Sequence, residues 1–121
     1  TERQNKEFVG IMRYLALGAS ILLATPAFAA QTVTATWYGK ELAGNRTASG
    51  EIFKPNGLTA AHRSLPFGTC LLVGNPRTGK SVRVRVNDRG PFTKGISLDL
   101  SAGAARAIGM RSTQKVTLKR C

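Results

Sequence analysis

The sequence predicts a mainly β protein, a small six-stranded closed barrel with one short helix, preceded by a signal peptide. Three observations support this prediction. Short β-branched and apolar segments alternate with turns rich in Gly, Pro and Asn. Only one segment has both the composition and the end signals of a helix. The first thirty residues differ in kind from the rest, which leaves residues 31–121 for a single domain.

Residues 1–30 show the order of regions that is typical of a secretory signal peptide. A basic start precedes the apolar run 15–24, and Ala27 and Ala29 then form an A-x-A cleavage site. The apolar run is too short for a membrane helix, which needs about 20 residues. Met12 offers an alternative start, with the residues before it an upstream extension. No cysteine stands at the cleavage site itself, so we expect a periplasmic or secreted protein without a lipid anchor.

Six segments of the remaining chain have strand composition. In chain order they are 32–38, 58–61, 69–73, 81–86, 96–100 and 115–120. The turn 75–79 joins two of them into a predicted β-hairpin. A closed barrel removes the exposed strand edges that so small a sheet could not otherwise cover.

The segment 81–86 alternates cleanly between valine and arginine, which predicts that its valines face the core. Asp88 continues the parity of the valines. We therefore expect a partly desolvated carboxylate there, suited to general acid–base work. An equally acceptable interpretation is that Asp88 and Arg89 only cap the turn before Gly90.

The one predicted helix covers 101–108. Ser101 is a suitable N-cap, the interior is rich in alanine, and Gly109 is placed to end the helix. Gly103 is the weak point of this prediction, because glycine disfavours the helix interior. Asp99 precedes the helix directly and is expected to help fix its N-terminus.

The two cysteines, Cys70 and Cys121, are predicted to form a disulfide, since an exported protein meets an oxidising compartment. Two unpaired thiols are the alternative. His62 is the only histidine, and with two cysteines it cannot complete a metal site unless distant carboxylates join it. No metal is therefore expected. Nucleophilic pairing of His62 with Cys70 or Ser49 lacks any local nucleophile motif. No phosphate-binding glycine loop is present, so no cofactor is expected.

The charge balance points to an anionic partner. Eighteen Lys and Arg face six Asp and Glu, a net charge of +12, and without the first thirty residues fifteen basic residues face four acidic ones, a net +11. Nucleic acid, an acidic membrane surface and an acidic polysaccharide all fit such a charge. Export and the scarcity of aromatic residues argue against nucleic acid. The four remaining acids, among which any acid–base group must lie, are Glu41, Glu51, Asp88 and Asp99.

Aromatic side chains occur together at Trp37 and Tyr38. Such a pair can stack on sugar rings, although packing in a core is its commoner use.

Taken in order, several blocks of the sequence resemble the rare lipoprotein A (RlpA) family of bacterial cell-wall proteins. The blocks are 35–39 (ATWYG), 47–51 (TASGE), 58–62 (LTAAH), 65–69 (LPFGT), 86–92 (VNDRGPF) and 98–101 (LDLS). The resemblance implies a double-psi β-barrel. It also implies a septal-ring lytic transglycosylase that cleaves peptidoglycan between its two sugars, preferring strands stripped of peptides, with a 1,6-anhydromuramyl product.

The family's functional residues fall on Asp88, Glu51 and His62. The resemblance implies that Asp88 is the acid/base, that Glu51 is a second acid or an electrostatic stabiliser, and that His62 orients a carboxylate or binds the sugar. One acid/base suffices, because the attacking hydroxyl belongs to the substrate. Groove-lining contacts are expected from Thr36, Tyr38, Ser49, Asn87 and Arg89.

The sequence also departs from the best-known members of the family. Their membrane-anchoring cysteine and their carboxy-terminal septal domain are not found in it. We therefore expect a monomer that acts on peptidoglycan strands without a stable membrane anchor. The alternative function is a non-catalytic, expansin-like module that binds polysaccharide.

Overall fold

The computed structural model describes residues 30–121, so nearly all of the predicted signal peptide lies outside the described residues. The strands are β1 (Gln31–Tyr38), β2 (Thr59–Ala61), β3 (Cys70–Asn75), β4 (Lys80–Asp88), β5 (Leu98–Ser101) and β6 (Gln114–Arg120). The helices are η2 (Lys40–Leu42), a single 3-10 turn, and α2 (Ala102–Ala107). All six predicted strands are confirmed. No helix in the described part is long and apolar enough to cross a bilayer.

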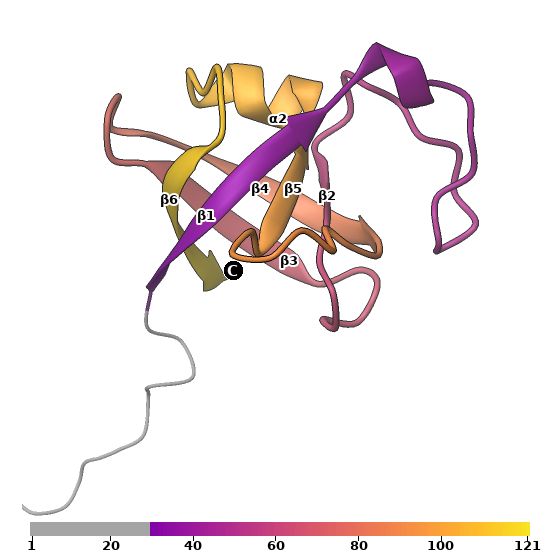
Figure 1. The fold of residues 1–121 in the computed structure, drawn as a ribbon, viewed down its shortest axis with the longest axis horizontal. Helices are drawn as coiled ribbons and strands as arrows, with labels where there is room; N and C mark the ends of the chain where they lie inside the picture. Colours follow the sequence, from indigo (N-terminus) through magenta and orange to yellow (C-terminus); the bar gives the residue numbers. More distant parts are fainter. Residues whose placement is uncertain (1–29) are drawn as a thin grey trace, which may run out of the picture.

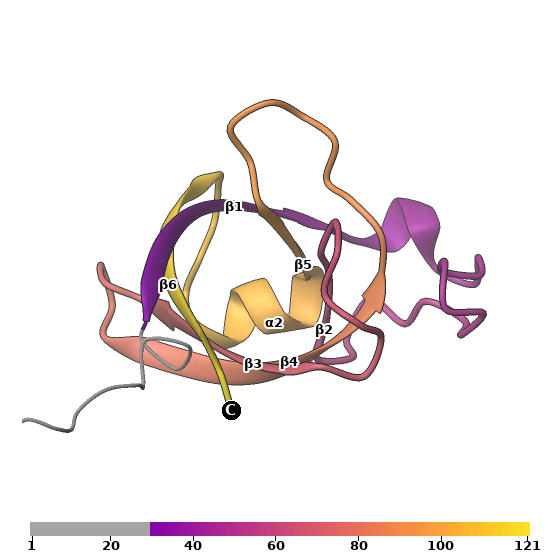
Figure 2. The same cartoon turned by 90° about the horizontal axis from the view of Figure 1, so that it is seen from below.

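The strands close into a barrel in the order β1-β5-β2-β4-β3-β6 (Figure 1). Two of the pairings, β1 with β5 and β2 with β4, are parallel and join strands far apart in the chain. The predicted hairpin is confirmed as the antiparallel pair β3–β4. Figure 2 looks along the barrel and shows α2 lying across its far end.

The barrel interior holds one apolar core built by alternation along the strands. Val84 and Val86 are fully buried, whereas Arg83 and Arg85 between and beside them are exposed, as the sequence predicted. The helix adds Ala104, Ala105 and Ile108 to this core. The outer face of the barrel is therefore free to carry polar groups.

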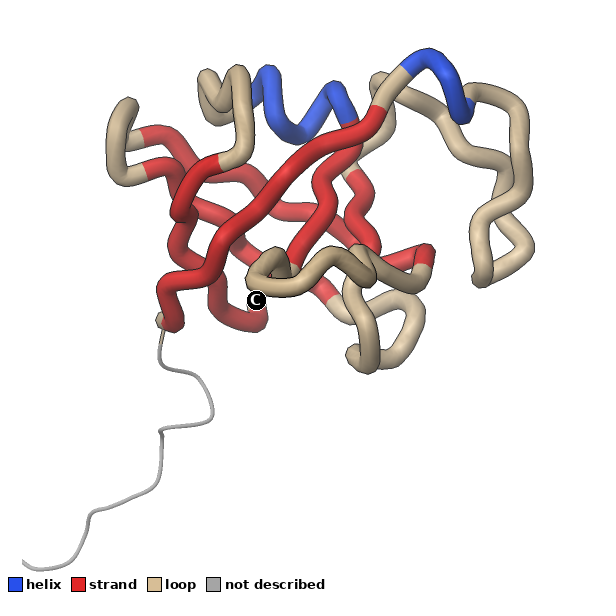
Figure 3. The backbone as a smooth tube through the Cα atoms, viewed as in Figure 1, coloured by secondary structure: helices blue, strands red, loops and turns tan. Residues whose placement is uncertain are grey.

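The helix begins and ends as predicted. Ser101 caps it, with its Oγ accepting from the backbone N–H of Ala104 at 3.2 Å, and Gly109 follows its last turn at a φ of 69°. Gly103 has a packing reason, because a Cβ there would lie 2.7 Å from the carbonyl oxygen of Asn56. Its N–H also donates to the carbonyl of Pro55 at 2.8 Å. The missing side chain thus lets the long loop 43–58, drawn in tan in Figure 3, lie against the helix.

The predicted disulfide between Cys70 and Cys121 is confirmed, with the Cα atoms 5.3 Å apart. It joins the start of β3 to the end of β6 across 51 residues of sequence. In the same place, the N–H of Cys121 donates to the carbonyl of Cys70 at 3.0 Å.

Replacing both cysteines with alanine is expected to lower the free energy of unfolding by about 2–4 kcal/mol, because the closed loop restricts the unfolded chain. Urea unfolding of the variant and of the reduced wild type measures this loss. Equal midpoints for oxidised wild type and the double variant would contradict the expectation.

Candidate functional site

Four residues on four neighbouring strands form a row on the outer face of the barrel. Asp99 on β5 is in register with Thr36 on β1 and with Ala61 on β2, and Ala61 is in register with Asp88 on β4. Register partners on adjacent strands share one face of a sheet. We call Thr36, Asp99, Ala61 and Asp88 the carboxylate row.

The position of Asp99 follows from alternation along β5. Leu98 and Leu100 are fully buried in the barrel core, so the side chain between them points away from it. The cap of α2 comes from Ser101, and the expected help of Asp99 at the helix N-terminus stays a prediction. The Oδ1 atom of Asp99 is buried and has no hydrogen-bond partner among residues 30–121.

Burial, followed by the negative charges of Asp88 and Glu41, raises the pKa of Asp99 to about 7. The ordinary value for this carboxyl is 3.8. A carboxyl group with a pKa near neutrality can hold a proton and release it at working pH. Asp99 is the residue of the site that sequence reasoning missed.

The substitution Asp99→Asn is expected to stabilise the protein at pH 8 and to change its stability little at pH 4. The folded-state pKa lies above the ordinary one, so the wild type loses stability as pH rises from about 4 through 7, whereas asparagine does not titrate. Thermal unfolding of both proteins at pH 4, 6 and 8 measures the difference. A difference that does not grow with pH would show that Asp99 is not desolvated in solution.

Asp88 occupies the other end of the carboxylate row. Its Oδ1 accepts from the backbone N–H of Ala48 and of Arg89, both at 2.9 Å. The predicted inward parity of Asp88 is wrong, because the β2–β4 register shifts between Ala60 and Ala61. The shift leaves Asp88 half-buried on the outer face, and Asn87 beside it is only 2% exposed because its side chain lies under Glu51 of the loop 43–58.

Tyr38 lies beside the row and packs under the long loop 43–58. Its ring stacks on Phe53 with the centroids 4.7 Å apart, and Ala61 completes this small outer cluster. Burial, followed by the charges of Asp88 and Asp99, raises the pKa of Tyr38 well above its usual range. Its hydroxyl therefore stays protonated, and it has no hydrogen-bond partner among the described residues.

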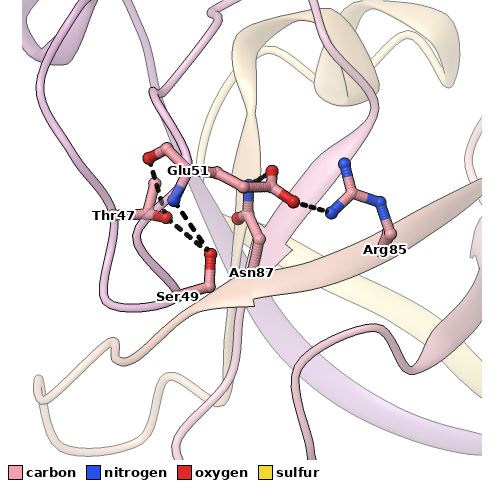
Figure 4. A network of polar contacts seen from close by, with 5 residues as sticks. All are labelled: Thr47, Ser49, Glu51, Arg85 and Asn87. Atoms are coloured by element: carbon pink, nitrogen blue, oxygen red, sulfur yellow. Dashed lines mark hydrogen bonds and ion pairs between the residues drawn. The ribbon is translucent and has the colours of Figure 1, made fainter.

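The TASGE block is fastened to the end of β4 next to the row. The N–H of Ser49 donates to the carbonyl of Asn87 at 3.2 Å, and Thr47 Oγ1 lies 3.0 Å from Ser49 Oγ (Figure 4). Asn87 Nδ2 in turn donates to Glu51 Oε1 at 3.0 Å. These bonds bring together two blocks that lie almost forty residues apart.

Glu51 is held as an anion. Arg85 donates to its Oε2 as an ion pair, and this bond, with that of Asn87, holds the pKa of Glu51 below its usual value. A carboxylate fixed in this way is a poor proton donor near neutral pH. It lies in an open cavity of about 470 Å³, lined by Glu51, Ile52, Lys54, Gly57, Leu58, Thr59, Arg85 and Asn87.

The structure does not bring the His62 side chain to the carboxylates. His62 Nδ1 accepts from the N–H groups of Ser64 and Leu65, both at 3.1 Å, so its neutral ring carries the proton on Nε2. Burial, and then the nearby charges of Arg89 and Arg63, lower the pKa of His62. The ring lines a separate cavity of about 320 Å³, which no carboxylate lines.

The backbone of His62, by contrast, reaches the site. Its N–H donates to the carbonyl of Asp88 at 3.2 Å, and its carbonyl accepts from Arg89 Nη1 at 3.2 Å. The Arg89 guanidinium also covers the ring of Phe67, 4.0 Å from its centroid. The Arg89 side chain is thus used to hold two loops together.

The other predicted contact residues lie around the row, with Thr36 in it and with Tyr38, Ser49 and Asn87 beside it. Residues 30–121 contain no group of three or more His, Cys, Asp or Glu that could hold a metal ion.

Comparison with known proteins finds relatives over most of residues 30–121. Residues 30–119 match the family described as lytic transglycolase. The chain is 65% identical over 79 residues to a probable endolytic peptidoglycan transglycosylase RlpA of Synechocystis sp., covering 65% of this chain and 25% of that protein. It is 49% identical over 84 residues to the endolytic peptidoglycan transglycosylase RlpA of Yersinia pestis, covering 69% and 23%. The chain therefore spans about a quarter of the length of these relatives.

Solved structures share the architecture. The expansin of Clavibacter michiganensis superimposes with a TM-score of 0.63 at 24% identity, over 77% of this chain and 50% of that one. A Streptomyces papain inhibitor gives 0.60 at 20% identity, over 80% and 98%. At these identities the likeness shows the fold alone. The predicted double-psi β-barrel is confirmed.

Proposed function

Because this chain belongs to the lytic transglycolase family, we propose that its barrel is an endolytic peptidoglycan transglycosylase. It cleaves the bond between N-acetylmuramic acid and N-acetylglucosamine and leaves a 1,6-anhydromuramyl end. The observation that carries the proposal is the carboxylate row, in which Asp99 and Asp88 flank Ala61 on the outer face of the barrel. The relatives named as peptidoglycan transglycosylases support the substrate class.

The two carboxyl groups have different roles in the reaction, one as proton donor and the other as proton acceptor. Asp99 has a pKa raised to about 7, so it donates its proton to the glycosidic oxygen as the bond to C1 breaks. The muramyl C6 hydroxyl attacks C1 and forms the new C1–O6 bond, and the Asp88 carboxylate accepts its proton. No water is consumed, and one proton exchange between the two groups restores the starting state.

Asp88 suits the accepting role because its position is fixed. Two backbone N–H groups hold Oδ1, which directs the remaining oxygen of the carboxylate. The negative charge of Asp88 also stabilises positive charge that develops at C1 in the transition state.

The remaining predicted residues hold the substrate or the loops. Thr36 in the row and Ser49 beside it contact the glycan strand, whereas Tyr38 and Asn87 are buried under the loop 43–58 and support the site from below. Glu51 stays ionised and keeps Arg85 and Asn87 in place beside its cavity. His62 is a positioning residue. Its ring nitrogen fixes the turn that follows it, and its backbone carbonyl accepts a hydrogen bond from Arg89.

The same proposal sets the surroundings in which the protein works. A disulfide is typical of proteins outside the cytoplasm, which supports a periplasmic or secreted protein. The partner is the glycan strand of peptidoglycan and not nucleic acid, and the barrel works as a monomer.

A release assay tests the function. The purified protein is incubated with amidase-treated peptidoglycan, and the soluble fragments are analysed by mass spectrometry. We expect 1,6-anhydromuramyl ends, which are lighter than reducing ends by one water. Reducing ends would make the protein a hydrolase. Cosedimentation with the wall and no soluble product would instead establish the expansin-like binding module.

A further inference from the structure

The aromatic pair at the end of β1 divides between two surroundings. Tyr38 is 7% exposed and belongs to the outer cluster, whereas Trp37 is 41% exposed. The indole Nε1 donates to the carbonyl of Arg111 at 3.1 Å, which fixes the ring beside α2. The proposed chemistry uses Tyr38 and leaves Trp37 without a role.

The indole ring borders two hollows in the surface. One has a volume of about 320 Å³ and the other about 540 Å³, and both are lined by Trp37, Ala102 and Arg106. Gly39 lies close to the ring, since a Cβ added there would lie 3.4 Å from its Cζ3 atom. Within residues 30–121 no aromatic ring or cation stacks on Trp37. An apolar ring face is thus open to a ligand.

The charges around the ring are mainly positive. Lys40, Arg106 and Arg111 line the hollows, against the single carboxylate of Glu41. Arg106 Nη2 donates to Asn56 Oδ1 at 2.7 Å, and none of these cations has an ion-pair partner in the described part of the chain. This surrounding favours a ligand that carries a negative charge beside an apolar or sugar face.

The hollows lie close to the proposed catalytic groups. Glu41 lines the larger hollow, and its charge is felt by Asp99, whose pKa it helps to raise. Trp37 follows Thr36 at the end of β1, and its side chain leaves the strand on the opposite side from Thr36 and Tyr38, beside α2. A glycan strand that runs over the carboxylate row and past this end of β1 can therefore continue onto the indole.

We propose that Trp37, Arg106 and Arg111 form a glycan subsite in which a muramyl ring stacks on the indole and its free lactyl carboxylate pairs with the arginines. This inference rests on the proposed function and names its substrate class. A muramyl residue stripped of its peptide carries a carboxylate directly on the sugar, whereas in a substituted residue that group is an amide. The subsite therefore selects stripped strands.

Trp37 is the only tryptophan of the chain, so its fluorescence reports on the subsite directly. The Asp99→Asn variant is titrated with stripped glycan strands, with strands that retain their peptides and with neutral chitohexaose, so that no cleavage interferes. Stripped strands should change the emission saturably and bind about fivefold tighter than chitohexaose, and 0.5 M salt should remove most of this difference. Peptide-bearing strands should bind no tighter than chitohexaose.

Three variants separate the contributions, with affinities measured by calorimetry. Arg106→Gln should weaken the binding of stripped strands about two- to fivefold and leave the binding of chitohexaose unchanged. Arg83→Gln, an exposed arginine on β4, is the matched control and should change neither. Trp37→Leu should weaken the binding of both ligands about tenfold, and circular dichroism checks that the barrel is intact.

Three results would contradict the subsite. Strands that cosediment with the protein while Trp37 emission stays constant would show that they bind elsewhere. Equal losses of affinity for charged and neutral ligands in Arg106→Gln would rule out carboxylate recognition. Equal losses of affinity in Arg106→Gln and Arg83→Gln would rule it out as well. Absence of anhydro products would refute the proposed reaction alone, because these titrations need no cleavage.

Discussion

Asp99→Asn is expected to lower the rate of anhydromuramyl release by about 10³-fold or more while leaving glycan affinity within about twofold of wild type. Asparagine keeps the shape of the side chain but cannot donate a proton to the leaving oxygen. Single-turnover release followed by mass spectrometry measures the chemical step, and sedimentation with stripped strands measures binding. A variant that keeps a tenth of the wild-type rate would exclude Asp99 as the acid.

The pH profile provides a second readout of the same group. Wild-type activity should fall as pH rises past about 7, because Asp99 then loses its proton. Glu41→Gln removes one of the negative charges that raise this pKa, so its activity should fall at lower pH than that of the wild type. If the pH profile of activity is the same in Glu41→Gln as in the wild type, a group other than Asp99 titrates.

Asp88→Asn is expected to lower release by about 10²-fold or more while binding stays nearly intact. Its Oδ1 can still accept from Ala48 and Arg89, so the TASGE block remains attached, but the amide cannot take the proton of the C6 hydroxyl. The same single-turnover and sedimentation measurements apply. Full activity in this variant would refute the assignment of Asp88.

Asp88→Ala separates chemistry from positioning at this residue. It loses both backbone hydrogen bonds as well as the carboxylate, and should therefore also lose about 1–3 kcal/mol of stability. Thermal unfolding of the two variants should place Asp88→Asn near wild type and Asp88→Ala below it. Equal destabilisation by both would show that the charge itself, and not the acceptor, holds the loop.

Local features of the fold were predictable because each depends on a few neighbouring residues. The alternation around Val84 required only a period of two, and Ser101 with Gly109 required only the stereochemistry of helix ends. The pairing of Cys70 with Cys121 followed from their number and from the export signal. Glu51 and Asp88 were identifiable because they lie inside family blocks.

Which residues meet in the site depends on the order of the strands in the barrel, and this order cannot be read from the sequence. From the sequence, Asp99 was expected to act at the N-terminus of the helix that follows it. The parallel pairing of β5 with β1 shows that it also lies beside Thr36. The inward parity predicted for Asp88 is wrong because a register shift against β2 pairs Asp88 with the outward-facing Ala61. His62 was expected to orient a carboxylate or bind the sugar, but its Nδ1 accepts from the N–H groups of Ser64 and Leu65 in its own turn.

The sequence by itself determined a small, basic, disulfide-bonded barrel with very few carboxylates, because periodicity, composition and cysteine count are local or additive properties. Only the tertiary structure decided which of those carboxylates meet, which of them is desolvated, and which of Trp37 and Tyr38 stays open. Burial and charge proximity arise from contacts between strands distant in the chain, here β1, β2, β4 and β5. The proton-holding role of Asp99 is therefore a property of the closed barrel.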